Sequence, residues 1–192
     1  MSKKNPSQGG KVSSKLQKTP VFEIIAVGNM KQKFGGIQDS IQDYLKRLQP
    51  YAPTLIVEAP EEPLHVNESP EHIMHAEARW IQKYLTHKQP RAVIALTERG
   101  ESYTSEAFAQ ALATWEPRVS PIQKGGISTH GAVAPTLFLI GGSLGLHPEI
   151  LQQATARLSL APMTFPHHLA RLVLVEQLYR ACRILYRHPY HH

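Results

Sequence analysis

The stretch from Thr136 to Phe165 decides the fold, and it reads TLFLIGGSLGLHPEILQQATARLSLAPMTF. Its first five residues are strand formers, and Gly141, Gly142 and Gly145 follow at once, where a strand passes into a helix. Glycines at such a place let the backbone adopt positive φ and approach a ligand closely. The spacing matches neither a Walker loop nor the dinucleotide-binding fingerprint, so this turn by itself is better explained as a tight structural turn.

A second turn in the same stretch, residues 160–165, leads into another expected helix. Between the two turns, Pro148 suits the first turn of a short helix. Open α/β sheets bind ligands beyond the carboxyl ends of neighbouring strands. Together, the two turns therefore predict a binding site at one edge of a sheet.

The rest of the chain alternates short apolar runs with segments of helical spacing, which favours an α/β fold with a largely parallel sheet. We expect strands at residues 21–27, 54–57, 91–96 and 136–140. We expect helices at residues 37–48, from Pro70 to before Pro90, from a cap at Ser105 to Trp115, and at about 166–187. Residues 97–100 are expected to leave the carboxyl end of the third strand as a turn.

Length and composition limit the possible classes of protein. At 192 residues, the chain has the size of one domain. Its apolar runs are too short for a membrane helix, and its N-terminus lacks the apolar segment of a secretory signal. Cys182 is the only cysteine, which excludes an internal disulfide and fits a reducing compartment. We therefore expect a cytoplasmic protein that does not engage a membrane.

The net charge of +6 is concentrated at the N-terminus. Five of the 21 basic residues lie within residues 1–20, which hold no acid, so the rest of the chain carries 16 basic and 15 acidic residues. We expect residues 1–20 to be a disordered, solvated tail, with the remnant of an organellar or added segment and a weak electrostatic contact to RNA as the alternatives. Residues 21–192 then form the folded domain. Within it, residues 117–135 are rich in glycine, proline and serine and predict a flexible loop.

The expected last helix has two different faces. One stripe indicates either a solvated face with local ion pairs or an edge that binds phosphate, and it holds Glu176, Arg180, Arg183 and Arg187. The opposite face is apolar enough to be core or a subunit interface, and it holds Leu172, Val175, Leu178, Tyr179, Cys182 and Leu185. Two histidines, His167 and His168, begin this helix, but no acid or cysteine stands at ligand spacing nearby, so we expect no metal site.

Six segments carry a resemblance to a known family. They are IIAVG (24–28), ALTERG (95–100), FLIGGSLGL (138–146), SLAPMTFPH (159–167), VLVEQLYRA (173–181) and HPYH (188–191). In order and spacing, residues 21–192 resemble the RlmH family of SPOUT-class methyltransferases, which modify N3 of a pseudouridine in large-subunit (23S) ribosomal RNA. The C-terminal third is the specific part of this match.

The resemblance implies a SPOUT-type α/β fold, with a mostly parallel sheet and a deep trefoil knot in the C-terminal half. It also implies a homodimer, S-adenosylmethionine as the cofactor, and ribosomal RNA in the ribosome as the partner. By motif match, the cofactor contacts fall on Leu96, Gly141, Leu160, Ala161, Pro162, Met163, Thr164 and Phe165.

Methyl transfer from a sulfonium mainly requires that donor and acceptor are aligned. The acceptor imide nitrogen must also lose a proton, and a histidine suits that task near neutral pH. His167 and His191 are both candidates, and the sequence does not choose between them. Arg171, Arg180 and Tyr190 are expected to position RNA phosphate or base. Because such sites are shared across the family's dimer, the proton acceptor can come from the other subunit.

Two alternatives to this function stay open. One is a non-catalytic RNA-binding or ribosome-associated α/β protein, which would ignore S-adenosylmethionine. The other is a SPOUT methyltransferase that acts on tRNA. Two segments depart from the family pattern: residues 1–20 precede its usual start, and residues 117–135 are longer and richer in glycine than its linker. The resemblance therefore implies no role for either segment.

Overall fold

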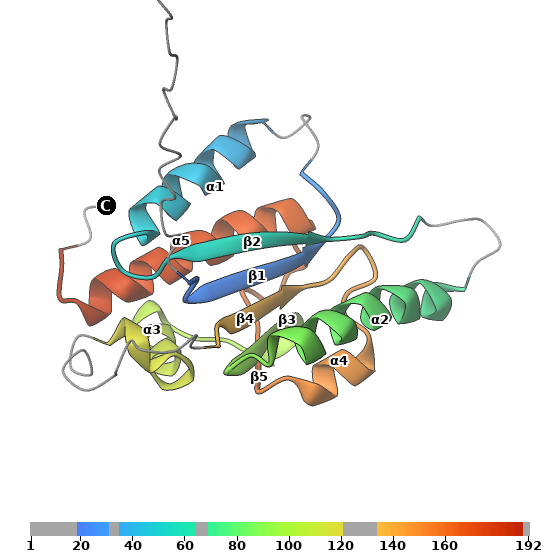
Figure 1. Ribbon diagram of the computed structural model, residues 1–192. Coiled ribbons are helices and arrows are strands. Elements are labelled where there is room, and N and C mark those ends of the chain that lie inside the picture. Colours follow the sequence, from blue (N-terminus) through green and yellow to red (C-terminus); the bar gives the residue numbers. More distant parts are fainter. Residues whose placement is uncertain (1–18, 31–34, 64–68, 121–133, 190–192) are drawn as a thin grey trace, which may run out of the picture.

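A computed structural model describes residues 19–30, 35–63, 69–120 and 134–189. Its five strands are β1 (Phe22–Val27), β2 (Thr54–Ala59), β3 (Ala92–Glu101), β4 (Thr136–Ile140) and β5 (Ala156–Leu158). They form one sheet in the order β2-β1-β4-β3-β5, and every neighbouring pair is parallel (Figure 1). The predicted α/β class with a parallel sheet is therefore confirmed.

Five helices cover the two faces of this sheet: α1 (Gly35–Leu48), α2 (Pro70–Lys88), α3 (Ser105–Trp115), α4 (Pro148–Gln153) and α5 (His167–Leu185). Successive strand residues point to opposite faces, so each buried strand serves two cores. In β1, Ile24 packs into the core formed with α1, α3 and α5, while Ile25 packs into the core formed with α2 and α4. Both faces are covered, as is usual for parallel sheets.

Of the two helix starts predicted from local signals, the one at Pro70 is confirmed. Ser69 caps α2, because its hydroxyl accepts a hydrogen bond from the His72 amide at 3.2 Å, and Pro70 is the first helical residue. In α3 the predicted cap is wrong by one residue. Thr104, rather than Ser105, accepts the hydrogen bond from the Ala107 amide at 3.2 Å.

The prediction that β3 ends at Leu96 is wrong, because the strand continues to Glu101. Residues 97–100 are therefore strand and not a turn. Leu96 and Glu101 both lie opposite Leu158 of β5, so a bulge separates the two pairings. A Cβ on Gly100 would lie 2.5 Å from the carbonyl carbon of Leu158, and only glycine allows this close approach.

The predicted loop 117–135 begins with ordered structure. A single turn of 3-10 helix covers Pro117–Val119. The fully buried Glu116 carboxylate accepts hydrogen bonds from the Arg118 guanidinium at 2.6 and 2.7 Å and from the Thr136 hydroxyl at 3.0 Å. This network ties the end of α3 to the start of β4. The middle of the predicted loop, residues 121–133, and most of the predicted tail, residues 1–18, lie outside the described residues.

The apolar face of α5 belongs to the core of the same subunit. Four of the residues predicted there are buried against neighbours that include α1 and α3, namely Val175, Leu178, Tyr179 and Cys182. A subunit interface through these four residues is therefore wrong. Burial also raises the pKa of the Cys182 thiol to about 12, as expected of a buried thiol with no reactive role. Among the described helices, none combines the length and apolarity needed to cross a bilayer.

Candidate functional site at the carboxyl edge of the sheet

Three segments predicted to bind the cofactor meet at one edge of the sheet. Leu96 lies in β3 where its pairing with β5 is interrupted, Gly141 directly follows β4, and residues 160–165 follow β5. Because β4, β3 and β5 are adjacent and parallel, their carboxyl ends share this edge. The strand order thus brings together the segments that the sequence selected. Their contact with a cofactor stays a prediction.

The glycine turn after β4 folds back on itself. Gly142 and Gly145 form a bridge in which the Gly145 amide donates to the Gly142 carbonyl at 3.1 Å, and Gly145 has φ of 81°. A Cβ on Gly141 would lie 2.4 Å from the carbonyl carbon of Gly145. The need for glycine at position 141 therefore arises from the turn's own backbone, and it requires no ligand.

The turn at residues 160–165 is fixed to the last residues of β3. The Ser159 amide donates to the Glu101 carbonyl at 2.9 Å, and the Thr164 hydroxyl donates to the Glu98 carboxylate at 3.0 Å. Between these anchors Met163 is 71% exposed. A large apolar side chain is thus held open to solvent at the edge where ligands of such sheets bind.

A second cluster lies beside this edge, at the ends of β1 and β2. The fully buried Arg171 guanidinium of α5 donates to the Glu58 carboxylate at 2.9 Å, to the Val27 carbonyl at 3.3 Å and to the Gly28 carbonyl. Burial lowers the pKa of Arg171, and Glu58 opposes that shift. In this arrangement Arg171 joins α5 to the sheet. The predicted contact between Arg171 and RNA does not fit this placement, because the side chain has no exposed surface.

His167 is the first residue of α5 and lies next to Gly28. Gly28 has φ of 87°, and a Cβ there would come within 3.0 Å of the His167 ring. Loss of hydration on burial lowers the pKa of His167, the positive Arg171 lowers it further, and Glu61 partly opposes both effects. The imidazole is therefore neutral near pH 7, which is the state needed to accept a proton.

Glu77 is a buried acid that the sequence analysis missed. It lies on α2 and is 6% exposed, with its carboxylate accepting from the Glu62 amide at 3.4 Å. A Cβ on Gly142 would come within 3.0 Å of this carboxylate, so Glu77 abuts the glycine turn. Burial, with help from Glu61 and Glu62, raises its pKa to about 7. A signal was available, because Glu77 interrupts the apolar stripe formed by Ile73, Ile81 and Leu85.

Of the remaining predicted residues, Arg180 lies toward the other end of α5. Arg180 pairs with Glu176 at 2.7 Å, so the expected ion pair four residues apart is confirmed. The chain beyond the helix is held by the Tyr51 hydroxyl, which lies 2.9 Å from Nδ1 of His188, and by Arg183, which donates to the Pro189 carbonyl. Tyr190 and His191 lie outside the described residues.

We call residues 190–192 the C-terminal tail and residues 188–189 its root. Arg180 and this root are far from His167 of the same chain. A 19-residue helix such as α5 is about 28 Å long. Within one subunit, the length of α5 therefore lies between His167 and the last described residues of the chain.

Comparison with known proteins gives a consistent family. Residues 21–191 match the family described as "Predicted SPOUT methyltransferase". Curated relatives named "Ribosomal RNA large subunit methyltransferase H" include a Symbiobacterium thermophilum protein, 38% identical over 173 residues, and a Clostridium botulinum protein, 40% identical over 173 residues. Each of these alignments covers 88% of this chain and 98% of the relative. The chain therefore belongs to the SPOUT methyltransferase family.

Proposed function

We propose that the protein transfers a methyl group from S-adenosylmethionine to N3 of a pseudouridine in large-subunit ribosomal RNA. The observation that carries this proposal is identity of 38–40% to proteins named as large-subunit ribosomal RNA methyltransferases, over nearly their whole length. The geometry supports it, because the segments expected to bind the cofactor share the carboxyl edge of a parallel sheet.

The residues at this edge fit S-adenosylmethionine. The turn at 160–165 is anchored at both ends and presents the exposed Met163, so apolar surface and backbone groups are available to a ligand. Leu96, Gly141 and residues 160–165 would hold the cofactor, whose sulfonium supplies an electrophilic methyl group. No charged side chain from these segments is needed for that contact.

His167 is the better-supported proton acceptor of the two histidines. The pseudouridine imide must lose its N3 proton, and His167 is held neutral by burial and by the positive charge of Arg171. It also begins α5 directly after the turn at 160–165, so it lies at the same edge. His191 stays a candidate.

The active unit is a homodimer in this proposal. Three half-buried apolar residues in the first two turns of α5, Leu169, Leu172 and Val173, lie outside both core clusters. A second copy that covers them could also bring its C-terminal tail to the carboxyl edge of the first copy. Because each copy makes the same contact in an isologous interface, each would supply its C-terminal tail to the active site of the other.

A trefoil knot belongs to the same proposal. After β5 the chain contacts the end of β3 through the bonds from Ser159 to Glu101 and from Thr164 to Glu98, and it continues into α5, which packs on the opposite face of the sheet from α4. This close crossing supports a threaded connection between β5 and α5.

One experiment separates the three candidate functions. Purified large ribosomal subunits and total tRNA are incubated with the protein and isotopically labelled S-adenosylmethionine, and the nucleosides are identified by mass spectrometry. We expect label in a methylated pseudouridine of 23S ribosomal RNA. Label in tRNA alone would indicate the tRNA enzyme. RNA binding without label, and without cofactor binding in calorimetry, would indicate the non-catalytic protein.

A further inference from the structure

One stripe of α2 carries basic and hydrogen-bonding side chains along its exposed side. His72, His75, Arg79, Lys83 and His87 follow one another at intervals of three or four residues, so they share one side of the helix. All five side chains are exposed, while Ile73, Ile81 and Leu85 face the core. We call these five exposed residues, with Gln82 and Thr86 beside them, the α2 stripe.

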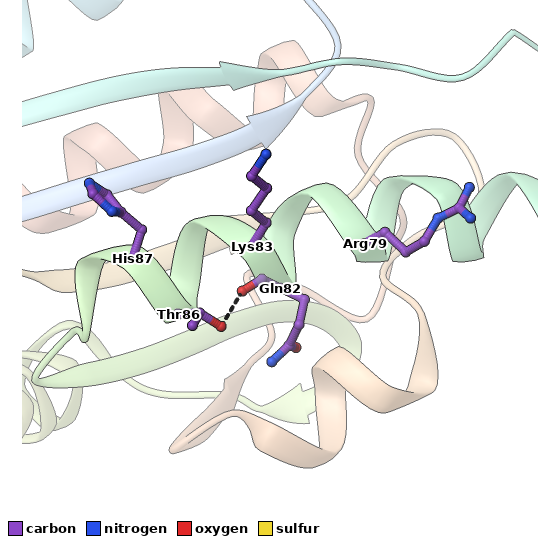
Figure 2. Close-up of a pocket in the computed structure, with 5 residues that line it drawn as sticks. All are labelled: Arg79, Gln82, Lys83, Thr86 and His87. Atoms are coloured by element: carbon purple, nitrogen blue, oxygen red, sulfur yellow. Dashed lines mark hydrogen bonds between the residues drawn. The ribbon is translucent and has the colours of Figure 1, made fainter.

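The α2 stripe has no acidic residue. Arg79 and Lys83 make no ion pair with any described residue. Two arginines on other helices differ in this respect, because Arg47 of α1 pairs with Asp43 and the partly exposed Arg180 of α5 pairs with Glu176. Toward the end of α2, Arg79, Gln82, Lys83, Thr86 and His87 line an open depression (Figure 2). Every residue around that depression can donate a hydrogen bond.

The α2 stripe also starts beside the candidate site. His75 stacks on His147 with ring centroids 4.7 Å apart, and His147 precedes α4 just after the glycine turn. From His72 to His87 the stripe extends about 22 Å along the helix axis. An extended anion that begins at the carboxyl edge could therefore follow α2 away from it.

We propose that the α2 stripe binds the phosphate backbone of the ribosomal RNA whose target base enters the carboxyl-edge site. This inference rests on the proposed function for the identity of the RNA. Arginine and lysine neutralise phosphates, while glutamine, threonine and histidine donate to phosphate and sugar oxygens. A protein partner fits less well, because the centre of a protein interface is apolar and the α2 stripe exposes no large apolar side chain.

The test compares two double variants with the same change in charge. Arg79→Ala with Lys83→Ala removes the two cations of the stripe, and Lys46→Ala with Arg47→Ala removes two exposed cations from α1. Affinity for 23S ribosomal RNA and for purified large subunits is measured from 50 to 200 mM KCl. We expect the α2 variant to bind about ten-fold more weakly at 50 mM KCl. The slope of log affinity against log salt concentration should be smaller in magnitude by about two.

The α1 variant should match the wild-type protein in both quantities, and Arg79→Lys with Lys83→Arg should restore binding. Thermal unfolding midpoints and S-adenosylmethionine affinity should be unchanged in all variants, because these side chains are exposed. Equal losses in the α1 and α2 variants would overturn the proposal. So would an α2 variant that loses affinity for large subunits but binds bare ribosomal RNA normally, since that result indicates a protein partner.

Failure of the inference can be told apart from failure of the proposed function. If the wild-type protein methylates ribosomal RNA and the α2 variant keeps its KM for large subunits, only the stripe is wrong. If no methyl transfer is found but the α2 variant still loses salt-dependent binding to ribosomal RNA, RNA binding by the α2 stripe is supported and the proposed methyltransferase function is wrong. If the wild-type protein binds no RNA, both are wrong.

Discussion

At the scale of single residues, Glu77 makes stability depend on pH. Its pKa is about 7 in the folded protein and 4.5 as the ordinary reference value, so between these pH values the folded state holds a proton that the unfolded state has lost. The free energy of unfolding therefore falls as pH rises from about 4.5 to 7. Glu77→Gln should raise it by about 1–3 kcal/mol at pH 8 and change it little at pH 4.5.

Urea unfolding at both pH values measures this difference. Glu71→Gln is the matched control, because Glu71 is an exposed acid in the first turn of the same helix. Because an acid in the first turn interacts favourably with the helix dipole, this change should lower the free energy of unfolding slightly at pH 8, by less than about 1 kcal/mol, where Glu77→Gln raises it. A Glu77→Gln protein no more stable than the wild type at pH 8 would contradict the assigned pKa.

Arg171 and Arg180 differ in a way that sequence could not reveal. Both lie on α5 and both pair with a glutamate, but the Arg171 side chain is fully buried while that of Arg180 is 26% exposed. Arg171→Ala would remove one donor from Glu58 and one from each of two backbone carbonyls, so we expect a loss of about 3 kcal/mol. Arg180→Ala should cost less than about 1 kcal/mol. Urea unfolding of the two variants should show this contrast, and similar losses would argue against it.

At the scale of elements, the sequence predicted helices better than it predicted β3. Signals for α2 are local: Ser69 and Pro70 mark its start, and Pro90 follows its end. The last five residues of β3 read TERGE and carry no strand pattern. They are strand because β5, more than fifty residues later, pairs with Glu101 and because Gly100 lets Leu158 approach. Contacts of that kind depend on the tertiary structure.

The C-terminal tail shows the same dependence on tertiary contacts. The His188 ring bonds to the Tyr51 hydroxyl at 2.9 Å and lies against the Tyr186 ring, so the root of the tail contributes to the fold. We expect that removing residues 190–192 leaves thermal stability and S-adenosylmethionine affinity unchanged but abolishes most methyl transfer. Removing residues 188–192 should in addition lower stability by about 1 kcal/mol.

Tyr51→Phe is the control for that comparison, because it removes the hydroxyl bonded to His188 and leaves the tail in place. It should reproduce the loss of stability with most of the methyl transfer kept. Full activity without residues 190–192 would show that the tail does not act on the substrate.

At the scale of the whole molecule, the binding edge could be predicted only in pieces. The glycine turn and the turn at 160–165 could be recognised in the sequence, and the predicted parallel sheet placed both turns at the carboxyl ends of strands. Their adjacency depends on β4 entering the sheet between β1 and β3, which no local pattern encodes. The cluster around Arg171 and Glu58 joins residues 113 positions apart, so its burial was equally hidden.

The outward apolar residues of α5 predict the dimer interface. Leu172→Glu places a charge there without touching either core cluster, so it should give a folded monomer. Light scattering at micromolar concentration should show a dimer for the wild type and a monomer for this variant, with methyl transfer lost. Gln110→Glu, which adds the same charge to the exposed side of α3, should stay dimeric and active. A monomeric wild type would rule out the proposed assembly.

Mixing subunits tests whether each site combines two chains. About 28 Å of helix separates His167 from the root of the tail, so an active site that uses both must take the tail from the partner.

A His167→Ala protein and a protein without residues 190–192 should each be nearly inactive alone. In a mixed dimer, one of the two sites regains an intact His167 and an intact tail. With random exchange at equal concentrations, half of the dimers are mixed, so about one quarter of wild-type activity should return. If mixed dimers form and no activity returns, the two elements do not complement each other across the dimer, and the proposed shared site is wrong.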